Sequence, residues 1–393
     1  MSEIRVTNIL GENGNSPVNF TQGINMSGIV TATSFVPSQG QLSNRNKVIN
    51  GAMTVSQRAT SFTSDGYILD RFKRSQSSDG AFTVTQSTTS PDGFAKSLKV
   101  DVTTADTSLA AGQYAQIIQK IEAQNLQDLA YGTSSAKNIV VSFYVRSNKT
   151  GNYSFNIQQQ DNSSKQVTLN YTINSANTWE RKTFSIAGDT SGVINDDNGS
   201  GFQISWGLAY GSTYTSGSAR PAWTTYADAD FGAGQAINLL DSTSNEWYLT
   251  GVQLEVGPVA TPFEHRTYQE EILRCMRYYQ QLTGNDRGYN GATGGSGSFK
   301  NSVIGIYNAA TDVRGIYYHM VPMRDEPSLT VLGALTDFDL EPFDRAPAAI
   351  SMQRPGVFQS TLLIQDSGNG TAGNACQLTI DQAAGGLAFN SEL

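Results

Sequence analysis

The sequence predicts an all-β protein, built mainly as an antiparallel β-sandwich of jelly-roll-like type, with a short linking helix and a smaller C-terminal β-domain. Of its 393 residues, 38 are Gly, 15% are charged, and Tyr and Phe number 17 each. Aromatic side chains favour strands, and glycine favours turns. Strand-like runs also recur at short intervals between residues 81 and 255, which is the spacing of a sandwich.

The strand-like runs share an alternation of apolar and polar side chains, and turn sequences such as Ser90-Pro91-Asp92-Gly93 separate them. Between the second and third runs, residues 114–129 predict one strand and one short helix. The eight runs are Ala81–Thr88, Ser97–Thr103, Asn138–Arg146, Gly151–Gln160, Gln166–Ile173, Glu180–Ile186, Phe202–Ala209 and Trp247–Glu255.

A helix is predicted directly after the last of these strands. Gly257-Pro258 ends the strand, and Thr267-Tyr268-Gln269-Glu270 has the Ser/Thr-x-x-Glu pattern of a capping box. Apolar residues then follow at helical spacing and form one stripe. We expect this stripe to contact other copies of the chain, and the residues that we assign to the oligomer interface are Ile272, Met276 and Tyr279.

The chain after the helix is again rich in glycine and patterned as strands, which predicts a second, smaller β-domain. Its strand-like runs are Val303–Tyr307, Gly315–Met320, Leu329–Val331, Gln359–Ile364 and Ala375–Ile380. We therefore divide the chain into an N-terminal attachment or oligomerisation segment with its linker, a sandwich, a linking helix and a C-terminal β-domain, with boundaries at 1–45, 46–266, 267–283 and 284–393.

The first 45 residues contain too short an apolar alternation to close a core of their own. Such a segment usually becomes ordered by pairing with its own copies or with a neighbouring protein, although a flexible tail is the simpler alternative. Pro37-Ser38-Gln39-Gly40-Gln41 indicates a linker to the sandwich.

Charge and hydropathy exclude several kinds of partner. The net charge is −8 and no basic run exists, so nucleic acid is not expected as a partner. No apolar run approaches about 20 residues, and the N-terminus lacks a secretory signal pattern. Cys275 and Cys376 lie far apart and are expected to be free buried thiols.

The strongest candidate for chemistry is a cluster of aromatic residues in Gly- and Ser-rich sequence. Sugar rings stack on flat aromatic faces, and residues 206–226 contain five such side chains. Trp206 is expected in the core. The residues that we assign to a glycan site are Tyr210, Tyr214, Trp223 and Tyr226, with ordinary packing as the alternative.

Catalysis has little support in the sequence, and no catalytic residue is assigned. His265 and His319 fall in different predicted domains, and no nucleophile has an evident partner. Acids such as Asp228, Asp230 and Glu255 fit turns and surfaces better than a glycosidase pair. No cofactor is implied. Calcium remains open because the turn Asn195–Gly199 offers hard oxygen ligands, but it lacks the closing Glu of an EF-hand loop.

Several motifs resemble those of phage tail-fibre-like virion proteins. Asn50–Arg58, Gln253–Gly257 with Ala260–Glu264, and Arg274–Tyr279 resemble the opening strand, the closing strand and the following helix of a sandwich similar to carbohydrate-binding modules. Gly28–Phe35 resembles repeats in structural proteins of marine and cyanobacterial phages.

This resemblance implies a tail fibre or tail-associated protein of the virion tail, assembled in the host cytoplasm. It implies a homotrimer that contacts other phage tail proteins through its N-terminal segment and host surface polysaccharide elsewhere, without inserting into a membrane. Two alternatives stay open: a polysaccharide-depolymerising tailspike enzyme, and a purely structural fibre or decoration component.

Overall fold

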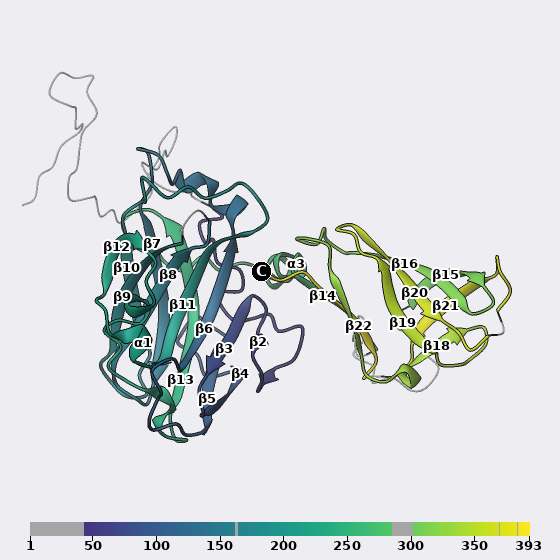
Figure 1. Ribbon diagram of the computed structural model, residues 1–393, viewed down its shortest axis with the longest axis horizontal. Coiled ribbons are helices and arrows are strands. Elements are labelled where there is room, and N and C mark those ends of the chain that lie inside the picture. The colour runs from purple at the N-terminus through teal and green to yellow at the C-terminus, as the bar shows by residue number, and fades with distance from the viewer. Residues whose placement is uncertain (1–42, 162–163, 285–301, 369, 383) are drawn as a thin grey trace, which may run out of the picture. The chain divides into compact units, whose positions relative to one another are not determined.

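A computed structural model describes residues 43–161, 164–284, 302–368, 370–382 and 384–393 (Figure 1). The described chain forms four sheets, and every paired strand in them is antiparallel. The prediction of an all-β antiparallel fold with a short helix and a smaller C-terminal β-region is confirmed. The expectations for residues 1–42 lie outside the described residues.

Two sheets form the sandwich. Sheet A contains, in spatial order, β1 (Ser61–Phe62), β4 (Ala81–Ser87), β5 (Ser97–Thr104), β13 (Glu246–Val256), β7 (Ile139–Ser147) and β10 (Glu180–Ile186). Sheet B contains β12 (Arg220–Thr225), β9 (Lys165–Ile173), β8 (Gly151–Gln159), β11 (Ser200–Tyr210), β6 (Tyr114–Glu122), β3 (Phe72–Ser77) and β2 (Gly66–Tyr67).

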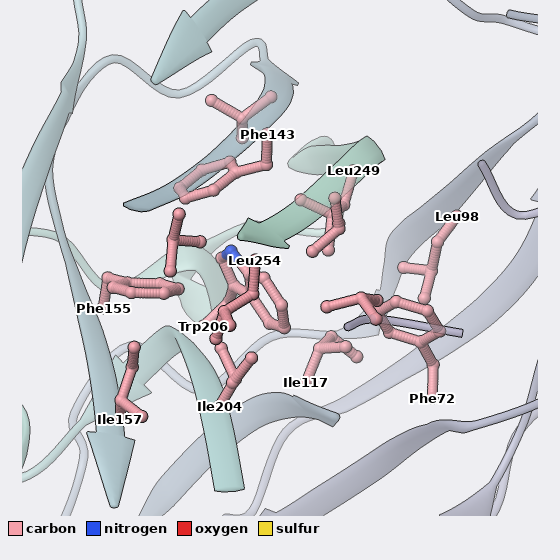
Figure 2. Packing of buried hydrophobic residues seen from close by; sticks show 14 of the residues in the cluster. Phe72, Leu98, Ile117, Phe143, Phe155, Ile157, Ile204, Trp206, Leu249 and Leu254 are labelled. Carbon is pink, nitrogen blue, oxygen red and sulfur yellow. The ribbon is translucent and has the colours of Figure 1, made fainter. Parts of the chain in front are cut away.

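The inner faces of both sheets supply one hydrophobic core. Phe143 and Leu249 come from sheet A, and Phe155 and Trp206 come from sheet B; all four are fully buried (Figure 2). Trp206 lies within 5.5 to 6.2 Å, centroid to centroid, of the Phe155, Phe143 and Phe72 rings. Burying each such side chain contributes about 1.5–3 kcal/mol, so this core holds the two sheets face to face.

A β-bulge in β13, the last strand of the sandwich, allows a backbone hydrogen bond to the Asn50-Gly51 turn near its start. The pairing of β13 with β7 shifts between Thr250 and Gln253, and Gly251 adopts a φ of 62°. A Cβ at Gly251 would lie 2.8 Å from the Phe94 ring, so only glycine fits there. The bulge frees Val252 N to donate to Gly51 O at 2.9 Å, which anchors the predicted Asn50-Gly51 turn.

The helices of the described chain are short. The α-helices are α1 (Ser212–Thr215), α2 (Asp228–Phe231) and α3 (Tyr268–Met276), and the 3-10 helices are η1 (Ala123–Leu129), η2 (Leu239–Asp241) and η3 (Leu335–Asp337). The predicted capping box is present at α3, where the Thr267 side chain accepts from Glu270 N. Within the described ranges, no helix has the length and apolar character needed to cross a membrane.

The C-terminal β-region has two further sheets and a core of its own. Sheet C contains β14 (Tyr279–Thr283), β22 (Gly386–Asn390) and β17 (Ser328–Leu332). Sheet D contains β18 (Phe338–Glu341), β21 (Ala375–Ile380), β15 (Ser302–Ala309), β16 (Asp312–Tyr318), β20 (Gln359–Gln365) and β19 (Ala349–Arg354). Their core includes Val303, Val313, Phe338, Leu362 and Phe389. The exact domain boundaries stay a prediction.

Candidate functional site

The outer face of sheet B is polar, and the segment of residues 211–235, apart from its edge strand β12, lies against it. Gln166 Nε2 donates to Ala227 O, and Asn170 Nδ2 donates to Ala233 O, each at 3.0 Å. Gln166 is fully buried although its side chain is polar. Buried amides are stable only when they are hydrogen-bonded, so this face requires the segment that covers it. The segment also carries the aromatic residues that the sequence singled out.

The covering segment and the sheet enclose a pocket of about 190 Å³. Its walls come from three strands of sheet B and from both short helices of the segment. Its lining residues are Tyr114 and Gln116 of β6, Gln158 of β8, Gln203 and Tyr210 of β11, Tyr214 of α1, Tyr226, and Asp228 and Phe231 of α2.

Five aromatic rings form one connected side of the pocket. The Tyr214 ring lies 5.7 Å from Tyr114 at 82°, and 5.8 Å from Tyr210 at 51°. Phe231 connects Tyr226 to this group, since its ring contacts Tyr210 edge-on at 5.7 Å and Tyr226 at 6.2 Å. Tyr210 is only 8% exposed, whereas Tyr114, Tyr214 and Tyr226 are half-buried and offer ring surface to a ligand.

Three glutamines supply hydrogen-bonding groups on the sheet side. Tyr210 OH donates to Gln116 Oε1 at 2.7 Å, and Gln203 Nε2 donates to Gln158 Oε1 at 3.0 Å. Each glutamine amide carries two donor hydrogens and an acceptor oxygen, so these side chains have hydrogen-bonding capacity beyond the contacts just named, and the lining supplies both donors and acceptors.

The electrostatics of the pocket are set by Asp228. Tyr226 OH donates to Asp228 Oδ1 at 2.5 Å. Burial raises the pKa of Tyr226, and its hydrogen bond to Asp228 and the charge of that carboxylate raise it further. Burial and Asp228 likewise raise the pKa of Tyr214. Both phenols therefore keep their protons at neutral pH, and the charged lining residue is an anion.

Three of the four residues assigned to a glycan site come together here, and the fourth does not. Trp223 stacks on Phe202 at 5.6 Å and 25° and packs edge-on against Tyr131 at 5.7 Å. Its Nε1 donates to Ala187 O at 2.9 Å. Trp223 thus lies on the margin of the sandwich core, outside the lining of the pocket, because β12 pairs with β9 at the edge of sheet B.

The three residues assigned to an oligomer interface also separate. Ile272 and Met276 are partly exposed on α3, but Tyr279 is only 6% exposed. The helix ends at Met276, so Tyr279 begins β14, where the Arg58 guanidinium lies 3.7 Å from its ring centroid. The buried side of α3 carries Glu271 and Cys275. Tyr279 therefore makes its contacts within the chain and is not part of a helical stripe.

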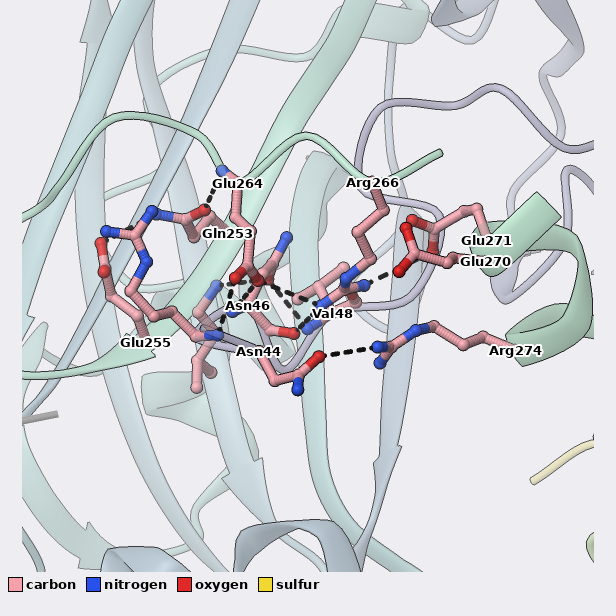
Figure 3. A network of polar contacts seen from close by, with 12 residues as sticks. Asn44, Asn46, Val48, Gln253, Glu255, Glu264, Arg266, Glu270, Glu271 and Arg274 are labelled. Atoms are coloured by element: carbon pink, nitrogen blue, oxygen red, sulfur yellow. Dashed lines mark hydrogen bonds and ion pairs between the residues drawn. The ribbon is translucent and has the colours of Figure 1, made fainter. Parts of the chain in front are cut away.

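The strand-to-helix stretch that resembled a family motif forms a polar network (Figure 3). The Glu264 carboxylate accepts from Arg45 N and Asn46 N, and the Arg266 guanidinium donates to the carbonyl groups of Asn46 and Val48. Burial lowers the pKa of Arg266 and the carboxylates of Glu271 and Glu264 counteract this shift, so the guanidinium is charged and paired. These residues hold the start of the sandwich against β13 and α3, which is a structural role.

The turn considered for calcium is organised by its own hydrogen bonds. Asn195 N donates to Asp161 Oδ2 at 3.0 Å, and Gly199 N donates to Asp197 Oδ1 at 2.8 Å. Within the residues that the structure describes, no three His, Cys, Asp or Glu side chains lie close enough to hold a metal ion. Both cysteines are free and buried.

The glutamines of the pocket are the functional candidates that the sequence did not reveal. Gln116, Gln158 and Gln203 lie more than 40 residues apart and meet because β11 pairs with both β6 and β8. The available signal was their position: each is a polar residue next to a core residue in a strand, and successive residues of a strand point to opposite faces. Only the strand order of sheet B brings these three residues together at one pocket.

Comparisons with known proteins give no family. No family model and no curated protein matches the chain. Solved structures similar to it include the enzymatically active domain of tailspike protein 4 of bacteriophage CBA120, with a TM-score of 0.30 and 12% identity over 54% of this chain. That match spans 21% of the tailspike chain.

Two further structures match over their whole length. A family 11 carbohydrate-binding module from Clostridium thermocellum has a TM-score of 0.27 and 10% identity, and covers 53% of this chain. A putative sugar-binding protein from Bacteroides thetaiotaomicron has a TM-score of 0.30 and 12% identity, and covers 54%. Because these likenesses are distant, the function is argued below from the residues of the pocket.

Proposed function

We propose that this chain is a glycan-binding protein and that the pocket on sheet B holds one sugar unit. The observation that carries the proposal is the pocket itself, which joins five aromatic rings to three amides and one carboxylate. Aromatic faces stack against the C–H groups of a sugar ring, and amides exchange hydrogen bonds with its hydroxyls. Groups of both kinds face the same small space.

The size and charge of the pocket favour a neutral sugar. Its volume of about 190 Å³ lies below that of sites for drug-sized ligands, so it suits a single ring. The charged lining residue is Asp228, and the Tyr226 and Tyr214 phenols beside it keep their protons. A carboxylated or sulfated sugar would meet repulsion from Asp228, whereas a neutral hexose or an amino sugar would not.

In the biological role that we propose, the protein is a tail fibre or tail-associated component of a phage virion, with a cyanobacterial host. Three chains would assemble, attach to the tail through residues 1–45, and adsorb to host surface polysaccharide. The motifs Asn50–Arg58 and Gln253–Gly257 support this role through their resemblance to tail-fibre-like proteins. Several weak pockets on one particle would bind together through their high effective concentration.

We propose that the chain binds polysaccharide without cleaving it. Glycosidases use a pair of carboxyl groups about 5–9 Å apart, and Asp228 is the carboxylate among the lining residues. Incubation of the purified protein with host polysaccharide, followed by size analysis, distinguishes the alternatives. Unchanged chain length is expected, and shortened chains would identify a depolymerising tailspike instead.

The binding proposal is tested with the purified full chain on an array of neutral, amino and acidic oligosaccharides. We expect binding to neutral or amino sugars that Tyr214→Ala and Gln116→Ala weaken at least tenfold. Asp228→Asn is expected to admit acidic sugars. If the chain bound no glycan on the array and did not compete with host adsorption, the purely structural alternative would replace this proposal.

A further inference from the structure

Strands β15 and β16 of sheet D carry apolar side chains on both faces. Val303, Tyr307 and Val313 point into the C-terminal core and are at most 2% exposed. The alternate positions point outward, and the apolar ones among them are Ile304, Ile306, Ile316 and Tyr318, while Arg314 of β16 lies on the same side opposite Ile306. A strand with apolar residues on both faces is typical of a sheet that is covered on both sides.

We call the exposed apolar residues on this side of the two strands the β15–β16 face and define it as Ile304, Ile306, Ile316 and Tyr318. Gly305 pairs with Gly315, which places Ile304 opposite Ile316 on the neighbouring strand. Their exposed fractions are 72%, 57%, 44% and 69% in sequence order. Cross-strand neighbours on one face lie about 5 Å apart, so Ile304 and Ile316 lie close together, and all four exposed side chains share one side of the strand pair.

The area of this face reaches what a specific contact requires. The four side chains expose roughly 500 Å² of apolar surface, so two such faces would bury about 1,000 Å², the lower bound for a specific interface. Met320 and Phe358, which are 72% and 70% exposed, lie where the β16–β20 pair ends and would enlarge the contact.

We propose that the β15–β16 face packs against the same face of neighbouring copies of this chain, where the three chains of the assembly proposed above meet. Every copy presents the same exposed apolar side chains, so each face has an apolar surface of equal size to pack against. The charged residues of the two strands are opposite in sign: Asp312 lies at the hairpin end, and Arg314 lies opposite Ile306 on the same side of the sheet. In a chain with a net charge of −8, a face without net charge is where two copies meet with the least repulsion.

This interface is separate from the sheet B pocket and from the α3 residues first expected to assemble the chain. Sheet D is formed by residues 302–380, whereas the pocket is lined by residues between 114 and 231. Self-association through sheet D would therefore leave every pocket residue unchanged. Loss of assembly and loss of glycan binding can then be measured independently.

The test compares charged variants of the full chain by light scattering after size-exclusion chromatography, from low to high micromolar concentration. The wild type is expected to form an oligomer, and Ile304→Glu combined with Ile316→Glu is expected to weaken assembly about 100-fold or more. Leu273→Glu on α3 is the matched control, because Leu273 is 40% exposed and Ile316 is 44% exposed. This control is expected to assemble like the wild type.

Tyr318→Glu provides a second variant that does not depend on the fold tolerating two new charges. Tyr318 is 69% exposed, so its replacement removes little packing, and circular dichroism should be unchanged. A wild type that stays monomeric at high micromolar concentration overturns the proposal. So does an oligomer that both face variants leave intact, or one that Leu273→Glu dissociates and the face variants do not.

Discussion

The outer faces of sheets B and D differ in polarity and in what covers them. Sheet B presents buried polar side chains, such as Asn156 and Gln166, and residues 211–235 of the same chain cover them. Sheet D presents Ile304 and Tyr318 to solvent, 72% and 69% exposed. The groups on the polar face make directional hydrogen bonds, whereas the apolar face can make only non-directional hydrophobic contacts.

This difference indicates what each face is suited to recognise. A covered polar face with a small pocket is suited to bind the individual hydroxyl groups of a ligand, because a buried amide without a hydrogen bond is energetically costly. An open apolar face recognises another apolar surface of similar size. Under the two proposals above, sheet B would bind a ligand and sheet D would contact another copy of the chain, and the expected effects of substitutions decrease from the core beneath sheet B to the surface of sheet D.

The largest effect is expected beneath the sheet B face. Trp206→Ala would remove a fully buried ring that contacts Phe72, Phe143 and Phe155, and would lower the free energy of unfolding by about 3–5 kcal/mol. Urea unfolding monitored by circular dichroism measures this change. A loss below about 1 kcal/mol would mean that the ring does not hold the two sheets together.

A smaller effect is expected within the polar layer itself. Asn156 Nδ2 donates to Thr168 Oγ1 at 2.9 Å, and both residues are almost fully buried. Asn156→Ala would leave the hydroxyl of Thr168 without this donor and lower the free energy of unfolding by about 1–3 kcal/mol. Ser351→Ala, on exposed sheet D surface, is the control and is expected to change it by less than about 0.5 kcal/mol.

Asp189, which is bonded by Gln159 at the end of β8 and by Lys165 at the start of β9, gives the stability a pH dependence. Burial raises the pKa of Asp189, but hydrogen bonds from Lys165, Ser191 N and Gln159 outweigh it and lower the pKa to about 2. A carboxyl group with a depressed pKa stabilises the fold above its unfolded value, which is near 3.8. Stability should therefore fall as pH decreases from about 4 to about 2.

Asp189→Asn tests this assignment directly. At neutral pH it is expected to cost about 1–2 kcal/mol, because Lys165 loses its buried partner. Below about pH 2 the difference from the wild type should shrink, since Asp189 is then protonated in both states. A difference that stays constant from pH 7 to pH 2 would show that the carboxylate charge is not the source of the stability.

The smallest effect on stability is expected on the sheet D face. Ile304→Asn alters a side chain that is 72% exposed, so the free energy of unfolding of the separated chain should change by no more than about 0.5 kcal/mol. The same substitution should weaken assembly. Calorimetry at low concentration measures the first quantity, and a large destabilisation there would mean that Ile304 belongs to the core of its own chain.

The strands of the sandwich were largely predictable because their alternation is strong and turn residues bound them. The predicted strand at Glu180–Ile186 is β10 itself, and Gly151–Gln160 differs from β8 by one residue. In the C-terminal region, β14, β18, β19 and β22 were missed, and prolines explain two of these cases, β18 and β19. Pro342, Pro347 and Pro355 lie beside these short strands and interrupt their pattern.

The site was predictable only where its residues are neighbours in sequence. Tyr210, Tyr214 and Tyr226 were identified from one aromatic segment, and they line one pocket. Trp223 belongs to the same segment, but pairing of β12 at the sheet edge turns it toward the core margin. The prediction that Tyr279 continues the apolar stripe of the helix is wrong, because α3 ends at Met276.

The central claim is that the pocket on sheet B binds a sugar, and calorimetric titration of Tyr214→Ala tests it most directly. The titrant is the neutral or amino oligosaccharide that the wild-type chain binds best on the array, and Trp223→Phe serves as the control because Trp223 lies outside the pocket. We predict at least tenfold weaker binding by Tyr214→Ala and unchanged binding by the control. Equal affinity of Tyr214→Ala and the wild type would contradict the claim.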